Sequence, residues 1–154
     1  MRRKEREISE ISEIESIITK SDVCRIAIAN DNMPYIVTMN FGYSGGKNPK
    51  LFFHCATGGR KIDMMKRNNY ICFEMDTDHE IFTGEKGCDW GMNYSSVVGY
   101  GKLSIVDGDA EKRAGLDHIM DHYGGSGVYS YDDQVLARTT VLRLDISEMT
   151  GKRK

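Results

Sequence analysis

The feature that most constrains this chain is an apolar segment that leads through two glycines into a helix start carrying two cations. Residues 51–55 are apolar apart from one histidine, and they are followed by Gly58 and Gly59 and then by Arg60 and Lys61. The first backbone N–H groups of a helix lack intrahelical acceptors, and the helix dipole places partial positive charge there. This order of residues indicates an anion-binding cradle suited to a phosphate ester. The alternative is a strand-to-helix turn with solvated basic side chains.

Length and charge limit the classes of protein that the chain can represent. A chain of 154 residues is expected to form one domain, residues 1–154, and a domain of this size buries about 70% of the surface of its unfolded chain. A net charge of −2 argues against sequence-independent binding of nucleic acid. No apolar run approaches the ~18 residues of a membrane span, and no apolar segment follows the basic start, so a cytoplasmic location is expected.

The four cysteines are spread along the chain without a C-x-x-C pair. We therefore expect reduced, buried thiols and no zinc site. His118 and His122 stand four residues apart on an expected helix, a spacing that can bind a metal but that more often lies on a solvated helix face. No Walker loop, dinucleotide-binding glycine motif or Ser-His-Asp arrangement is visible, so hydrolase and nucleoside-triphosphatase activities have no support.

The spacing of apolar residues predicts short strands with a few helices. Isoleucines at three- and four-residue spacing indicate an amphipathic helix over residues 7–20. The other expected elements are strands over 23–29, 33–41, 51–55, 70–75, 94–106 and 139–146, and helices over 60–68 and 109–123. Residues 42–50, 76–91 and 124–133 are expected to be loops. Six short strands in hairpin-like succession predict a small, closed and mostly antiparallel barrel with helices outside it.

Two glycines, Gly99 and Gly101, interrupt the strand expected over residues 94–106. Interior glycines of a strand mark a bend, a bulge or the close approach of another backbone, and the sequence leaves all three explanations open.

Three segments, taken in order, resemble the flavin-binding split-barrel superfamily. They are residues 33–43, residues 53–63 and residues 94–102. Within the superfamily they look most like the nitroimidazole-resistance (Nim) group of pyridoxamine 5'-phosphate oxidase-like proteins, and the likeness extends over about residues 1–150. The resemblance implies a mainly β fold, a six-stranded antiparallel split barrel with peripheral helices, and a homodimer with two FMN sites at the subunit interface.

The resemblance also implies which residues bind the flavin. At the edge of the isoalloxazine ring we expect Val37, Thr38, Met39 and Asn40. At the phosphate we expect Arg60 and Lys61. From the partner chain, Ser95 and Ser96 are expected to reach the flavin. A phosphate dianion between paired cations at a helix start gains charge-assisted hydrogen bonds, so physical reasoning agrees for the phosphate.

His54 is the candidate catalytic residue, because a histidine at this place in the strand of Nim-like proteins lies near the flavin. An imidazole can donate or accept a proton during reduction of a substrate. The alternative is a hydrogen-bonded structural residue, which is the commoner role of a lone histidine in an apolar strand.

The resemblance therefore predicts an FMN-dependent reductase of small oxidised compounds such as nitroimidazoles or other nitroaromatics. Two alternatives stay open: a flavin carrier or sensor without turnover, and a binder of another cofactor such as deazaflavin or haem. Trp90, near Cys88, is expected to pack at the subunit interface or to cover the flavin, and Tyr129 and Tyr131 either anchor a loop or contact the flavin.

Overall fold

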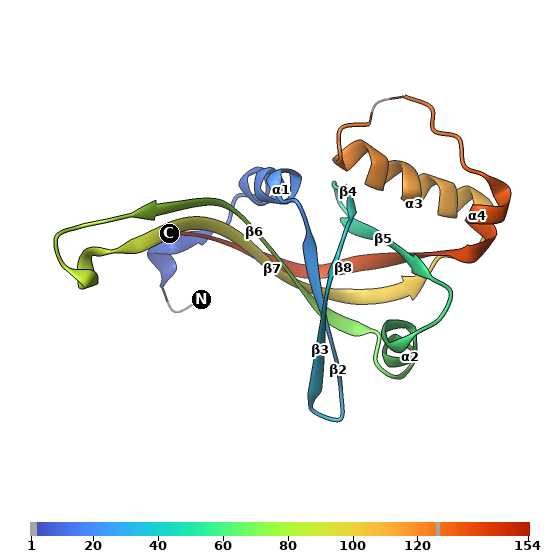
Figure 1. Cartoon of the computed structure of the whole chain (residues 1–154), viewed down its shortest axis with the longest axis horizontal. Coiled ribbons are helices and arrows are strands. Elements are labelled where there is room, and N and C mark those ends of the chain that lie inside the picture. Colours follow the sequence, from blue (N-terminus) through green and yellow to red (C-terminus); the bar gives the residue numbers. More distant parts are fainter. Residues whose placement is uncertain (1–2, 126) are drawn as a thin grey trace.

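The computed structural model describes residues 3–125 and 127–154, and its centre is one antiparallel sheet (Figure 1). The strands follow the order β3-β2-β6-β7-β8-β5-β4, and β1 pairs with β8. Their bounds are β1 Glu7–Ile8, β2 Cys24–Asn30, β3 Met33–Met39, β4 Gly42–Ser44, β5 Lys50–Ala56, β6 Tyr70–Phe82, β7 Gly91–Ile105 and β8 Thr139–Arg153. The helices are α1 Ile11–Lys20, α2 Arg60–Arg67, α3 Asp109–His122 and α4 Asp133–Arg138, with 3-10 turns at Lys4–Arg6 and Gly87–Asp89.

The predicted mainly β, antiparallel split barrel with peripheral helices is confirmed, with two differences in detail. The described residues form eight strands rather than six, because β1 and β4 add short edge segments. The path of strands is open, since β3 and β4 end it and do not pair. The expectation of closure assumed short strands, whereas β6, β7 and β8 have 13, 15 and 15 residues and enclose the core by twisting.

The hairpin of β2 and β3 turns at the residues that the sequence indicated. Asp31 and Asn32 both have positive φ angles, of 51° and 59°. A two-residue turn with positive φ at both positions matches the twist of the flanking strands, and Asp and Asn tolerate this conformation better than most residues.

Helix α1 is amphipathic as predicted, with Ile14, Ile17 and Ile18 buried on one face. It begins at Ile11 rather than at residue 7. Residues before it form β1, in which Glu7 and Ile8 pair with the end of β8. The backbone hydrogen bonds of this segment therefore go to a strand that is distant in the sequence.

Residues 76–91, expected to be a loop, form the end of a long hairpin arm at the left of Figure 1. Strand β6 continues to Phe82 and pairs with the start of β7 at Gly91, after a register shift between Thr77 and Glu80. Side chains beyond Asp78 in β6 are exposed, so this part lacks the alternation of buried and exposed residues that identifies a strand in sequence. The last strand was expected to end at residue 146, whereas β8 continues to Arg153.

The two glycines within β7 allow close contacts. A Cβ atom on Gly99 would lie 2.4 Å from the Phe73 ring, and one on Gly101 would lie 2.3 Å from the Asp145 carbonyl oxygen. A register shift between β7 and β8 falls between Tyr100 and Gly101. A bulge and the close approach of neighbouring atoms together explain both glycines.

The core has two parts. The larger part lies on the face of the sheet that α1 and α2 cover, and its largest fully buried side chains include Phe41, Phe53 and Phe73. The smaller part lies between the opposite face and α3 and comprises Phe52, Val106, Ile119 and Val141, with Leu116 packed against it. Helix α3 thereby covers β4 and β5, which places α3 and α4 beside the outward face of β5 (Figure 1).

Both histidines of α3 pack against aromatic rings, so the expectation of a solvated helix face is wrong. The His118 ring stacks on Phe52 with centroids 5.1 Å apart, and the His122 ring lies 4.1 Å from that of Phe41. His122 Nε2 is also 2.8 Å from the carbonyl oxygen of Ser21. The described residues contain no group of three side chains placed to bind a metal.

The cysteines differ in burial more than expected. Cys24 is buried, Cys55 and Cys72 are half-buried and Cys88 is exposed, and all four are free thiols. Only Cys24 therefore meets the expectation of a fully buried thiol. No helix within residues 3–125 and 127–154 is long and apolar enough to cross a membrane.

Candidate functional site

A cavity of about 490 Å³ lies where β3 and β5 end and α2 begins. We name it the cation cavity; its lining residues are Thr38, Met39, Asn40, His54, Cys55, Ala56, Lys61, Arg138 and Thr139. Strand pairing brings these segments together, because Ala56 at the end of β5 is opposite Thr139 at the start of β8. Arg138, the last residue of α4, directly precedes that pair.

The start of α2 has the features that the sequence predicted. The helix begins at Arg60, and Gly59 before it has a φ of 117°, a conformation that favours glycine. No side chain caps the helix, and a Cβ atom on Gly58 or Gly59 would meet no atom within 4 Å. The space in front of the helix start is open, as an anion cradle requires.

Two cations of the cation cavity lack a carboxylate partner among the described residues. Lys61 Nζ lies 3.0 Å from the thioether sulfur of Met39, a weak acceptor, and Arg138 Nε donates to the carbonyl oxygen of Gln134 at 3.2 Å. By contrast, Arg25 and Arg143 each pair with two carboxylates. Two positive charges that have no carboxylate partner within the described part of the chain could bind an anion in this cavity.

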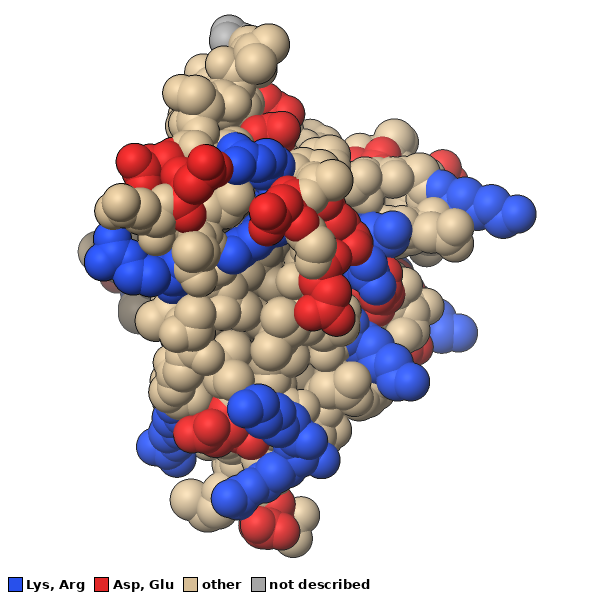
Figure 2. Space-filling view, turned by 90° about the vertical axis from the view of Figure 1, so that its right-hand side faces the viewer, with Lys and Arg blue, Asp and Glu red and all other residues tan. Residues whose placement is uncertain are grey.

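Figure 2 shows basic side chains gathered near the lower end of this face of the molecule, with acidic side chains among them, below a broad uncharged area. Helix α2 contains four basic residues, Arg60, Lys61, Lys66 and Arg67.

Arg60 and Lys61, predicted to act as a pair, are separated by the structure. The Arg60 guanidinium lies over the Tyr35 ring, 4.8 Å from its centroid, and does not line the cation cavity. Arg138 stands in the cavity instead. Sequence analysis missed Arg138 because it placed residues 124–133 in a loop and did not recognise α4. One signal could have found this helix: Asp132 is its N-cap and accepts from the backbone N–H groups of Gln134 and Val135.

Three of the four residues expected at the flavin ring line the cation cavity. They are Thr38, Met39 and Asn40. Val37 does not, and its side chain packs against the core. Any contact from Val37 to a ligand in this cavity would involve its backbone.

His54 does not have the surroundings of a structural histidine. It occupies an exposed, outward position of β5, and its side chain makes no hydrogen bond to any of the described residues. It lines the cation cavity and a second, apolar cavity beside it. His54 therefore stands at the junction of two cavities with its ring nitrogens available.

Cys55 is the other ionisable group in the cation cavity besides His54 and the two cations. Burial raises the pKa of its thiol, and the nearby charge of Lys61 opposes this only in part. The thiol therefore stays protonated near neutral pH and leaves the positive charge of Lys61 unneutralised.

Ser95 and Ser96 lie away from the cation cavity of their own chain. Ser95 pairs with Arg153 near the far end of β8, whereas Thr139 of the cavity begins that strand. Ser95 is buried and lies within hydrogen-bond distance of the Arg153 side chain, 3.4 Å. A contribution of these serines to a partner chain's site stays a prediction.

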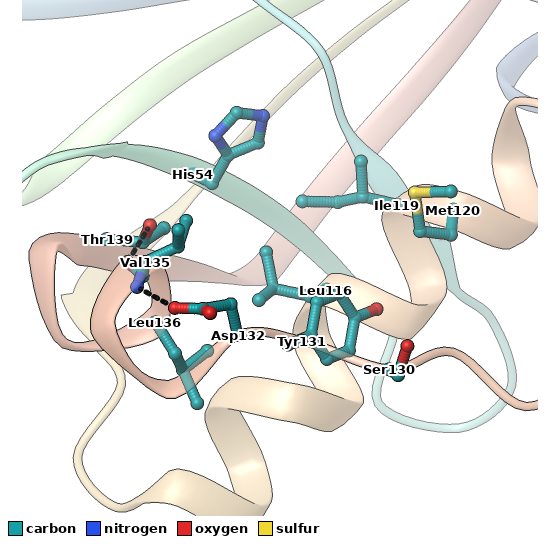
Figure 3. A pocket seen from close by; sticks show the side chains of 10 residues that line it. All are labelled: His54, Leu116, Ile119, Met120, Ser130, Tyr131, Asp132, Val135, Leu136 and Thr139. Atoms are coloured by element: carbon teal, nitrogen blue, oxygen red, sulfur yellow. Dashed lines mark hydrogen bonds between the residues drawn. The ribbon is translucent and has the colours of Figure 1, made fainter.

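The second cavity, of about 360 Å³, lies between β5, α3 and α4 (Figure 3). We name it the apolar cavity; its lining residues are His54, Leu116, Ile119, Met120, Ser130, Tyr131, Asp132, Val135, Leu136 and Thr139. Sequence analysis did not identify it, because its walls come from segments that are distant in the chain.

The aromatic residues left open by the sequence have defined places. Tyr129 and Tyr131 anchor the loop before α4 to α3, by donating to Asp121 at 2.9 Å and to Asp117 at 2.7 Å. Trp90 is exposed on the hairpin arm, where its indole N–H donates to the Gly84 carbonyl oxygen at 2.9 Å.

The fold and the cation cavity define a split-barrel protein in which Lys61, Arg138 and a histidine line one cavity. The sequence model described as pyridoxamine 5'-phosphate oxidase matches residues 10–153, and the chain belongs to this family. The family resemblance read from the sequence is thereby confirmed.

The chain is also similar to solved structures. A candidate 5-nitroimidazole antibiotic resistance protein from Bacteroides thetaiotaomicron VPI-5482 is 34% identical, with a TM-score of 0.83 and coverage of 96% of this chain and 86% of that chain. This similarity places the chain with the nitroimidazole-resistance group.

Two further structures share the fold at lower identity. An FAD- and haem-binding protein from Mycobacterium smegmatis is 16% identical over 97% of this chain and 73% of that chain, with a TM-score of 0.82. An FAD-binding protein from Mesorhizobium loti is 22% identical over 97% of both chains, with a TM-score of 0.68. No curated protein matches the chain significantly.

Proposed function

We propose that the chain is a flavoprotein that binds FMN in the cation cavity and reduces small oxidised compounds, with nitroimidazoles and other nitroaromatics as candidate substrates. The observation that carries the proposal is the presence of Lys61 and Arg138 in one cavity with His54, neither cation having a carboxylate partner in the part of the chain that the structure describes. FMN combines a phosphate dianion with an uncharged planar ring, so the charges of this cavity fit its phosphate.

The solved relatives support a flavin ligand, since two of those named above are FAD-binding proteins. The phosphate of FMN is a terminal monoester, which suits a cavity that ends at the open start of α2. On this basis we favour FMN over a dinucleotide.

In this proposal the flavin supplies the redox chemistry and the chain supplies binding, orientation and a proton. Lys61 and Arg138 bind the phosphate, and Thr38 and Asn40 hydrogen-bond to the ring from the edge of β3. His54 is exposed at the cavity wall and donates a proton to the compound that is reduced.

We further propose that the protein is a cytoplasmic homodimer with flavin sites at the subunit interface. The face of the sheet that α1 and α2 do not cover carries exposed apolar residues: Ile36 on β3, Tyr70 on β6, and Val98 and Tyr100 on β7. Exposed apolar side chains gathered on one face of a sheet support an interface there. In this proposal Ser95 and Ser96 of one chain contact the flavin bound by the other.

The test is flavin binding by purified variants, measured by fluorescence quenching of added FMN. Removing one charge-assisted hydrogen-bond donor costs about 1.5–3 kcal/mol, so Lys61→Ala and Arg138→Ala should each weaken binding roughly tenfold to 100-fold. Lys66→Ala and Arg67→Ala are matched controls, because these substitutions remove charges of the same kind from the exposed last turn of α2. Arg60→Ala should bind like the controls.

Undiminished FMN affinity in the Lys61→Ala, Arg138→Ala double variant would refute the phosphate site. The absorption spectrum of the purified protein separates flavin from deazaflavin and haem. A yellow protein that reduces no acceptor with any donor would be a carrier or sensor instead of a reductase.

A further inference from the structure

The apolar cavity differs from the cation cavity in its charges. Leu116 and Ile119 of α3 and Leu136 of α4 contribute aliphatic surface, and no Lys or Arg of the described residues lines it. Its one carboxylate, on Asp132, already accepts hydrogen bonds from the backbone N–H groups of Gln134 and Val135, at 2.9 and 3.1 Å. An anionic ligand would therefore find no Lys or Arg to pair with in this cavity, and it would meet the negative charge of Asp132.

Most polar groups in the wall are also paired. The Tyr131 hydroxyl donates to Asp117 at 2.7 Å, and burial together with that carboxylate raises the pKa of Tyr131, so the phenol stays neutral. The Thr139 hydroxyl donates to the Val135 carbonyl oxygen at 2.8 Å. Among the polar residues that line the cavity within the described part of the chain, only His54 and Ser130 have no side-chain hydrogen bond. A ligand can therefore form few directional contacts, and these lie at the rim.

The position of His54 links the two cavities. His54 and Thr139 line both of them, and Figure 3 shows His54 at one edge of the apolar cavity, on the side away from Leu136. A molecule in the apolar cavity therefore has its polar end next to the contents of the cation cavity. The volume of about 360 Å³ is near the lower end of the range for ligand pockets, which suits a molecule of one or two rings.

We infer that the apolar cavity binds an uncharged aromatic molecule of one or two rings, with its hydrogen-bonding group at the His54 edge. One part of this inference rests on the proposed function: we take the bound molecule to be the compound that is reduced at the neighbouring flavin. Its apolar ring displaces water from Leu116, Ile119 and Leu136, which supplies the affinity. Anionic analogues are excluded, because the cavity would bury their charge without a cationic partner.

Val135 offers a variant that changes the cavity without endangering the fold. It lines the apolar cavity, yet it is 55% exposed and only its backbone takes part in the capping of α4. Val135→Glu places a carboxylate at the cavity, and Val135→Phe occupies part of its volume. Val128 is fully exposed and does not line the cavity, so Val128→Glu and Val128→Phe are matched controls.

The probes are indole and its anionic analogue indole-3-carboxylate, titrated in ligand-observed NMR experiments with and without FMN. We expect indole to bind the parent and both Val128 variants with equal affinity. We expect both Val135 variants to bind it at least about tenfold more weakly. Indole-3-carboxylate should bind at least about tenfold more weakly than indole to the parent.

The inference is overturned if the Val135 variants bind indole like their Val128 controls, or if the anionic analogue binds as tightly as indole. FMN affinity, measured on the same samples, separates the two proposals. A protein that binds FMN but not indole refutes the aromatic site and leaves the flavin assignment intact. A protein that binds indole as expected but not FMN refutes the flavin assignment and keeps the aromatic site.

Discussion

The substitution Gly42→Ala tests how α3 is held against the sheet and hence how the apolar cavity is built. A Cβ atom on Gly42 would lie 2.3 Å from the carbonyl carbon of His118 and 2.4 Å from the backbone nitrogen of Ile119. Backbone atoms within a 14-residue helix cannot rotate away, so α3 as a whole would have to move off β4. Forcing an extra carbon into a packed site typically lowers the free energy of unfolding by about 1–3 kcal/mol. Because the clash here is with backbone atoms, we expect a loss of about 2–3 kcal/mol.

Thermal unfolding followed by circular dichroism measures this effect. For a domain of about 150 residues, 1 kcal/mol corresponds to roughly 2–4 °C in Tm, so Gly42→Ala should lower Tm by roughly 4–12 °C. Gly87→Ala is the control, because a Cβ atom there would meet nothing within 4 Å and its φ is not positive. A Gly42→Ala protein that melts with the parent and with the control would show that α3 does not contact β4 so closely. Since Leu116 and Ile119 lie on α3, Gly42→Ala should also weaken the binding of indole.

Two further substitutions test the proton donor and the charged groups on the sheet. His54→Ala should retain FMN affinity but lose about 100-fold or more in reductase turnover. His79→Ala, a control on the hairpin arm, should leave turnover unchanged. Equal turnover in the two variants would remove His54 from the mechanism. Burial alone would raise the pKa of Asp76, but hydrogen bonds from Arg25 and His79 outweigh it and lower that pKa below its ordinary value of 3.8. The ionised Asp76 carboxylate, bonded to Arg25 and His79, therefore stabilises the fold above pH 3.8, and this stabilisation is lost as the pH falls further. Asp76→Asn should lower the free energy of unfolding by less than about 1 kcal/mol at pH 7, and urea titrations should show that the difference from the parent vanishes in acid. A difference that persists or grows in acid would contradict this account.

Elements whose signals are local were predictable from the sequence. The isoleucine spacing of α1, the Asp31–Asn32 turn and the glycine pair before α2 each act over a few residues, and the structure has all three. Five of the predicted site residues line one cavity: Thr38, Met39, Asn40, His54 and Lys61.

Features that depend on pairing between distant segments could not be read from the chain. The extension of β6 to Phe82 lacks a buried face, so only its pairing with β7 makes it a strand. The partner of Lys61 in the cation cavity is not its neighbour Arg60 but Arg138, which reaches the cavity because β5 and β8 pair at Ala56 and Thr139.

The sequence by itself determined the family, the strand and helix that hold the anion cradle, and the histidine beside it, because those properties depend on residue types within a few positions of each other. The tertiary structure alone decided which two cations share a cavity and that an apolar cavity lies next to them. Both depend on the packing of α3 and α4 against β5, and the contacts that hold these helices there join residues far apart in the chain.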